Sequence, residues 1–153
     1  MFYKTSFTLL IIAGFYLMTR PNRNVRNNNP LNIRESADWE GESEVNKDKD
    51  FEEFTTPEYG FRAAYKILMT YRNKYDLRTI SDIIHRWAPT SENDTQAYID
   101  YVSKRVDASG LFGLYEYDLS REQYPQLMLA MADFEGAKGA FTLEQAEAGM
   151  SLA

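Results

Sequence analysis

A helix-start signal followed by an apolar stripe, between Ser120 and Gly136, constrains the fold of this chain more than any other feature. Ser120 and Gln123 stand three residues apart and form a capping box, which satisfies the first backbone N–H groups of a helix. Gly136 is suited to the other end of that helix. Apolar side chains recur between these signals at helical spacing, so one face should be buried. They are Tyr124, Leu127, Met128, Met131 and Phe134.

Glu135 occupies an unusual position on this helix. Helical steps of three or four residues lead from Met128 through Met131 to Glu135, so a carboxylate falls on the apolar stripe in the last turn. Burial and the negative end of the helix dipole both disfavour a charged carboxylate there. A carboxyl group with a raised pKa is a candidate general acid. The alternative is a Glu135 that faces solvent beside a frayed helix end.

Further segments carry helical periodicity and helix-start residues, and they predict a mainly α domain. A small β element is expected around residues 33–55, before the first long helix. The predicted helices run from Pro57 to Tyr75, from Thr79 to Trp87, from Asn93 or Asp94 to Val106, and from Thr142 to about Ser151.

Composition restricts the chemistry that such a domain can perform. The chain of 153 residues has no Cys and a single histidine, His85, which excludes thiol nucleophiles, histidine-based catalytic triads and multi-histidine zinc sites. A formal net charge of −6 argues against a nucleic-acid partner, which would require a basic face. Hydrolytic chemistry must therefore use carboxylates, and we expect neither a cofactor nor a metal.

The N-terminal segment is apolar and indicates a membrane anchor over residues 1–19. Lys4 precedes an apolar run over residues 7–18, and no small-x-small cleavage site follows it, so the segment should stay on the protein. A buried core helix is the alternative. Residues 20–29 are polar and predict a linker, which leaves residues 30–153 as the folded domain.

Three segments resemble proteins that act on bacterial cell walls. NNNPLNIR, followed by Trp39, Gly41 and PEYGFRA, resembles a segment of phage and prophage virion proteins and lysins, and is similar to a segment of bacterial glucosaminidases. RWAPTSENDTQAYIDYV resembles motifs of glucosaminidases and lytic transglycosylases in which a helix carries a tyrosine, here Tyr98, into the cleft. Phe134-Glu135-Gly136 resembles the end of the catalytic helix of lysozyme-like enzymes.

The order of these segments differs from that of the lysozyme-like families. There the helix with the catalytic glutamate precedes the other two segments, whereas here it comes last. A circular permutation explains the difference with one change of connectivity. The resemblance therefore implies a lysozyme-like, circularly permuted domain behind the anchor helix. Leu31 departs from the pattern, because the phage motif usually has Gly at this position.

The activity that this resemblance implies is cleavage of the β-1,4 glycosidic bonds of peptidoglycan. Glu135 would protonate the glycosidic oxygen and Tyr98 would steady the reacting centre. A second carboxylate could come from Glu35, Asp38 or Glu92, or the substrate's own hydroxyl or N-acetyl group could complete the reaction. The residues expected to bind the glycan strand are Asn29, Asn32, Trp39, Trp87, Asn93 and Thr95.

Two other interpretations stay open at this point. The chain could be a phage virion structural or membrane protein that keeps a degenerate lysozyme-like fold, or a module that binds glycan without cutting it. In each case the expected partners include the membrane, through residues 1–19, and other virion proteins. The expected location is a virion membrane or the periplasmic side of the host envelope, for genome delivery or lysis.

Overall fold

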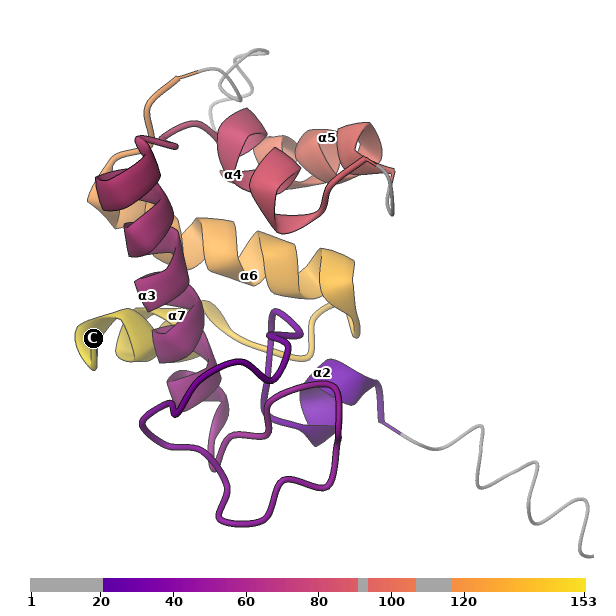
Figure 1. Cartoon of the computed structure of the whole chain (residues 1–153). Coiled ribbons are helices and arrows are strands. Elements are labelled where there is room, and N and C mark those ends of the chain that lie inside the picture. Colours follow the sequence, from indigo (N-terminus) through magenta and orange to yellow (C-terminus); the bar gives the residue numbers. More distant parts are fainter. Residues whose placement is uncertain (1–20, 91–93, 107–116) are drawn as a thin grey trace, which may run out of the picture.

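The computed structural model describes residues 21–90, 94–106 and 117–153, and over these ranges the chain is mainly helical (Figure 1). The prediction of a mainly α protein is confirmed. The predicted membrane anchor, residues 1–19, lies outside the described residues. Within them, no helix combines the length and the apolar character needed to cross a membrane.

The helices begin at the signals that the sequence provides. Thr142 and Gln145 form both halves of a capping box, and the hydroxyl of Thr79 accepts the N–H of Asp82. Ser120 and Gln123 also form a capping box, which opens a short 3-10 turn that continues into the next helix. The elements are α2 (Arg23–Arg26), α3 (Pro57–Tyr75), α4 (Ile80–Trp87), α5 (Thr95–Val106), η2 (Arg121–Gln123), α6 (Tyr124–Glu135) and α7 (Leu143–Ser151).

Helix α6 runs through the middle of the molecule (Figure 1). It packs against α5, α7 and α3, and α4 in turn packs against α5. The predicted apolar stripe is buried from Tyr124 to Met131, whereas Phe134 in the last turn is 39% exposed. The small residues Ala130 and Ala132 are buried as well, so α6 is covered on more than one side. Since burial of apolar surface is the main stabilising term in folding, α6 forms the centre of the core.

Helix α7 crosses α3 at very short range, at a point where α7 carries glycine. A Cβ atom on Gly149 would lie 2.5 Å from Cβ of Phe61 and 2.6 Å from the backbone oxygen of Glu58. The absence of a side chain at this position therefore lets the two backbones approach. This contact places the C-terminal helix across the first long helix.

The segment between α2 and α3 is an irregular loop with little β structure. Two isolated antiparallel bridges, Arg34 with Phe51 and Glu42 with Phe54, correspond to the predicted small β element. Asn29 organises the loop from inside. Its amide nitrogen donates to the carbonyl oxygens of residues 33 and 52, both at 2.9 Å, and its oxygen accepts the N–H of residue 33 at 2.8 Å.

Residues 20–29, the predicted linker, differ from that expectation where the structure describes them. They form α2 and contain buried asparagines. Asn24 packs against the end of α6, where its amide nitrogen donates to the backbone oxygen of Ala132 at 3.3 Å and its oxygen accepts the N–H of Ala137 at 3.5 Å. A buried amide that satisfies the end of a central helix belongs to the domain, so the domain starts before residue 30.

We expect the substitution Gly149→Ala to destabilise the protein, although alanine is the better helix former. Helix propensity alone would add about 1 kcal/mol of stability. The new methyl group meets backbone atoms that cannot rotate away, and such overpacking typically costs about 1–3 kcal/mol. The expected net result is a loss on the order of 1–2 kcal/mol in the free energy of unfolding, measured by chemical denaturation.

Ala148→Ser is the matched control, because Ala148 is exposed on the same helix. Its free energy of unfolding should stay within about 0.5 kcal/mol of the wild-type value. A gain in stability for Gly149→Ala would contradict the close approach of α7 to α3.

Candidate active site

Glu135, the last residue of α6, lines a cleft with a volume of about 390 Å³. The cleft lies between the loop of residues 31–36, the α3 side chains Ile67 and Tyr71, and the end of α4 at Trp87. Helix α6 positions Glu135 there because the apolar residues of the preceding turns are buried in the core. The alternative of a solvent-facing carboxylate at a frayed end does not hold, since neighbouring side chains contact Glu135.

Two hydrogen-bond donors converge on one oxygen of this carboxyl group. The hydroxyl of Tyr98 donates to Oε1 of Glu135 at 3.0 Å, and Nε1 of Trp87 donates to the same oxygen at 3.2 Å. The side chain of Asn32 is a further hydrogen-bonding neighbour that lowers the pKa of this carboxyl group. Tyr98 and Trp87 therefore fix Oε1 of Glu135 within the cleft.

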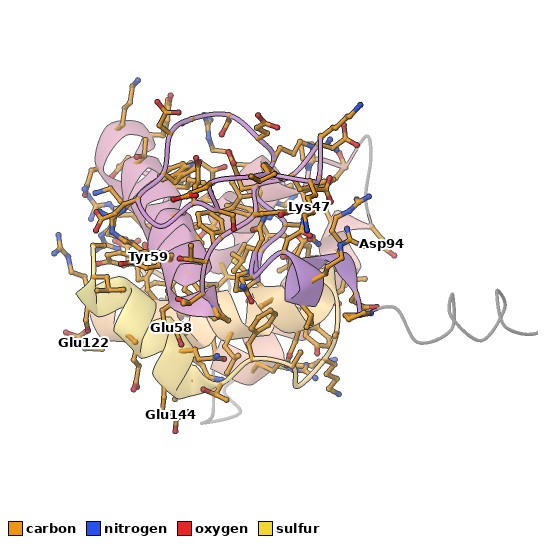
Figure 2. The ribbon with its side chains drawn as sticks, turned by 90° about the horizontal axis from the view of Figure 1, so that it is seen from below. Lys47, Glu58, Tyr59, Asp94, Glu122 and Glu144 are labelled. Atoms are coloured by element: carbon orange, nitrogen blue, oxygen red, sulfur yellow. The ribbon has the colours of Figure 1, made fainter. Side chains whose placement is uncertain are left out.

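Burial is the largest influence on the pKa of Glu135 and raises it above the ordinary value. The hydrogen bonds of neighbouring donors, Tyr98 first, act in the opposite direction. Glu122 and Glu144 differ from Glu135, because they stand at the outer rim of the molecule near helix starts (Figure 2). There, hydrogen bonds from backbone N–H groups lower the pKa of each carboxyl. The expectation that Glu135 has a raised pKa agrees with the structure.

Tyr98 is buried behind Glu135 and is held there by an aromatic neighbour. Its ring stacks on that of Phe134, with centroids 4.0 Å apart and planes 17° apart. Burial, followed by the charge of Glu135, raises the pKa of Tyr98 well above its ordinary value, so its hydroxyl keeps its proton and acts as a donor. The sequence placed Tyr98 near Glu135, and the structure brings the two together.

Asn32 is the part of the asparagine-rich loop that reaches the cleft. Its amide nitrogen donates to the backbone oxygen of Glu135 at 3.1 Å, which closes the end of α6. Its side-chain oxygen is buried without a hydrogen-bond partner among the described residues, and the residue lines the cleft. A left-handed backbone conformation, with φ of 49°, directs the residue in this way and is one that asparagine tolerates. Asn32 therefore offers an unused acceptor beside the carboxyl group.

Three other residues expected to bind substrate are placed elsewhere. Asn29 is fully buried, with its amide occupied by loop backbone, and Thr95 is buried with its hydroxyl donating to the backbone oxygen of Ala88 at 2.7 Å. Both are structural, because buried groups whose hydrogen bonds are satisfied cannot reach a ligand. Trp39 does not line the Glu135 cleft but borders a second groove along α3. Asn93 lies outside the described residues.

The candidates for a second carboxylate are not in the cleft. Glu35 and Asp38 are exposed and line a different hollow, next to the buried Glu52. Glu92 lies outside the described residues. Among the residues that the structure describes, Glu135 is the one carboxylate that lines its cleft.

Sequence reasoning missed two residues of the site. Tyr71 lies within the helix predicted from Pro57 to Tyr75 and was not among the expected site residues, yet it lines the cleft, and burial raises the pKa of its hydroxyl. Asn24 fell in the predicted linker, although it caps α6. Nothing in the local pattern distinguishes an asparagine of a linker from one that satisfies a distant helix end.

No protein-family model matches the chain. Over 131 residues the chain is 44% identical to Protein P5 of Pseudoalteromonas phage PM2, an alignment that covers 83% of this chain and 79% of that protein. The expected kinship with phage proteins is confirmed, whereas the lysozyme-like resemblance stays a prediction. The chain belongs to the family of Protein P5 of Pseudoalteromonas phage PM2.

Proposed function

We propose that this phage protein is a peptidoglycan-cleaving glycosidase, of lysozyme or lytic transglycosylase type, with Glu135 as its general acid. The observation that carries the proposal is a carboxyl group that lines a cleft, has its pKa raised by burial and is held by Tyr98 and Trp87. Glycoside cleavage requires an acid of this kind, because the leaving oxygen must be protonated as the bond breaks. The other residues of the cleft need only bind and orient the substrate.

The two donors suit both protonation states of Glu135. With a proton on Oε2, Glu135 can donate to the glycosidic oxygen while Oε1 stays fixed by Tyr98 and Trp87. After transfer, the same two donors stabilise the resulting carboxylate, since hydrogen bonds to a charged acceptor are strong. Burial thus favours the protonated form of Glu135 before proton transfer. The hydrogen bonds from Tyr98 and Trp87 then stabilise the carboxylate that remains.

The second half of the reaction can proceed with one protein carboxylate. The described part of the cleft supplies Glu135 alone, so the attacking group would be water or a hydroxyl of the substrate, with Glu135 now acting as base. Water gives a reducing end, and the sugar's own hydroxyl gives an anhydro product. Mass spectrometry of the released fragments distinguishes the two, because the anhydro product is lighter by one water molecule.

The proposed fold relationship is a circularly permuted lysozyme-like domain. Its support is the contact between the end of α6 and the asparagine-rich loop, which are 103 residues apart in sequence yet joined by the Asn32–Glu135 hydrogen bond. In a protein with the usual order, the chain would continue from the glutamate helix towards such a loop. Here the two are adjacent in space without being adjacent in sequence, as a permutation requires.

The proposed setting is the bacterial envelope during infection. A phage that must cross or leave a walled cell needs local opening of peptidoglycan, and the chain belongs to a phage protein family. Residues 1–19 would anchor the domain to a membrane of the virion or to the host envelope. Genome delivery and lysis both fit this placement.

The substitution Glu135→Gln should abolish the activity of the full-length chain, purified in a mild detergent, against Gram-negative peptidoglycan. Glutamine keeps the shape and accepts the same hydrogen bonds but cannot donate a proton as an acid. Loss of a general acid lowers the rate by about 10²- to 10⁴-fold. The measurement is the decrease in turbidity of purified sacculi, with circular dichroism to confirm folding.

Glu147→Gln removes an exposed carboxylate from α7 and is the matched control, with the wild-type rate expected. Equal clearing by wild type and Glu135→Gln would remove Glu135 as the acid. If folded wild-type protein does not clear the sacculi, the result would favour a virion protein without catalytic activity.

The rate should fall as pH rises through the raised pKa of Glu135, because the reaction needs the protonated acid.

Trp87→Phe removes a donor that favours the charged form, so it should raise the pKa of Glu135 further and move the alkaline limb of the pH–rate profile to higher pH. Trp39→Phe is the control for the position of the alkaline limb, since Trp39 is not a hydrogen-bond partner of Glu135. A shift to lower pH in Trp87→Phe would contradict the assigned hydrogen bond.

The same carboxyl group should make the folded state sensitive to pH. A folded pKa above the unfolded value means that the native state binds the proton more tightly. The contribution of Glu135 to stability is therefore present at low pH and is lost as pH rises through its folded pKa. We expect Glu135→Gln to be more stable than wild type at neutral pH and equally stable in acid. Urea unfolding at both pH values measures this, and a wild type more stable at neutral pH would contradict the assignment.

A further inference from the structure

A second groove, of about 1160 Å³, continues from the Glu135 cleft along α3. Ile67 and Tyr71 line both hollows, so the two form one continuous surface. Helix α3 carries most of the wall of this groove and runs the length of one side of the molecule (Figure 1). The α3 groove, as we call it, therefore lies where a polymer bound at Glu135 would extend.

The charges of the α3 groove are opposite to those of the whole chain. Lys66, Lys74, Arg86 and Arg121 line it, and none of the described side chains that line it is acidic, although the formal net charge is −6. All four are exposed. Within the described ranges, no carboxylate lies within 4 Å of any of them, whereas four other arginines of the described chain form ion pairs. These cations are thus available to an acidic ligand.

Aromatic rings hold one of these cations in place. The guanidinium of Arg86 lies 5.0 Å from the ring centre of Tyr71 and 3.9 Å from that of Tyr75. Stacking orients the planar guanidinium, which also hydrogen-bonds to Tyr71. Its other N–H groups can donate to the oxygens of a carboxylate. Lys74 lies 5.3 Å from the Tyr75 ring, on the same surface.

The α3 groove also holds an unused hydrogen-bond donor. Nε1 of Trp39 is buried and has no partner among the described residues. A buried donor without a partner is costly, and a ligand carbonyl would satisfy it. The cations suit carboxylates, and the Trp39 donor suits a peptide carbonyl. Together with the aromatic rings, they fit an acidic peptide better than a further length of neutral glycan.

We propose that the α3 groove binds the acidic peptide stems that peptidoglycan strands carry, so that the substrate is the peptide-bearing strand rather than bare glycan. This inference rests on the proposed function, because it takes the Glu135 cleft as the place where the glycan lies. The stems branch from the sugar chain and carry several carboxylates each. A stem from a sugar bound near Glu135 would enter the groove past Tyr71, the residue common to both hollows.

Binding to soluble, uncrosslinked glycan strands tests the proposal in the full-length Glu135→Gln protein in mild detergent. One probe carries its peptide stems, and the other has lost them to an amidase, which leaves one lactyl carboxylate on the sugar. We expect fluorescence anisotropy to show binding about tenfold tighter to the peptide-bearing probe, the order that a few exposed charge pairs supply. Added salt should reduce this preference because exposed charges are screened.

The double variant Lys66→Gln/Lys74→Gln, in the same background, should lose most of this preference. Lys104→Gln/Lys138→Gln removes the same charge from exposed positions outside the groove and should keep it. Equal binding of both probes, or an unchanged preference in the Lys66/Lys74 variant, would overturn the proposal. So would a change of oligomeric state in that variant without an effect on strand binding, which would assign the groove to a second copy of the chain.

The two proposals fail in different ways. A wild type that cleaves neither probe would overturn the proposed function, whereas the binding preference of Glu135→Gln reports on the α3 groove alone. A wild type that cleaves both probes equally, with equal binding, would overturn only the assignment of the groove.

Discussion

The position of Glu135 depends on how the end of α6 is closed. The last carbonyl groups of a helix have no partners within it, and here two asparagine amides supply them. Asn24 donates to the backbone oxygen of Ala132 and Asn32 to that of Glu135. Gly136 makes this possible, because any Cβ at that position would occupy the space of the Asn24 side chain. The final turn is therefore fixed from outside by residues more than a hundred positions earlier, and its carboxyl group is aimed into the cleft.

This closure places a carboxyl group where a structure built only for stability would not have one. Desolvation raises the pKa of Glu135, while Tyr98 and Trp87 hold one of its oxygens. The combination is unfavourable for folding at neutral pH but useful for proton transfer, since both the acid and its conjugate base have defined partners. Glu52 is also buried with a raised pKa, yet its oxygen accepts the N–H of Ser36 and stabilises a loop. Placement in the cleft is what separates Glu135 from that structural carboxylate.

The helices could be predicted because their signals are local. Capping pairs, as at Ser120 and Thr142, and apolar periodicity both act within a few residues. The helical spacing that puts Glu135 on the buried face is equally local. The roles of the asparagines could not be predicted in this way. Asn29 and Asn32 belong to one short motif, but one bonds its own loop and the other bonds α6. Their partners are set by tertiary packing, which the motif does not encode, and the resemblance assigned both to the substrate.

The contact of Asn24 with the end of α6 bears on how the proposed activity would be placed relative to a membrane. Asn24 follows the predicted anchor by only a few residues, and it contacts the backbone immediately after Glu135. A chain held to a membrane by residues 1–19 would therefore hold Glu135 close to that membrane, with few residues between them. The reach of the cleft would be set by the fold and not by a flexible tether. Such an arrangement is better suited to opening the wall locally, beside the membrane that carries the protein, than to a protein that diffuses through the whole sacculus.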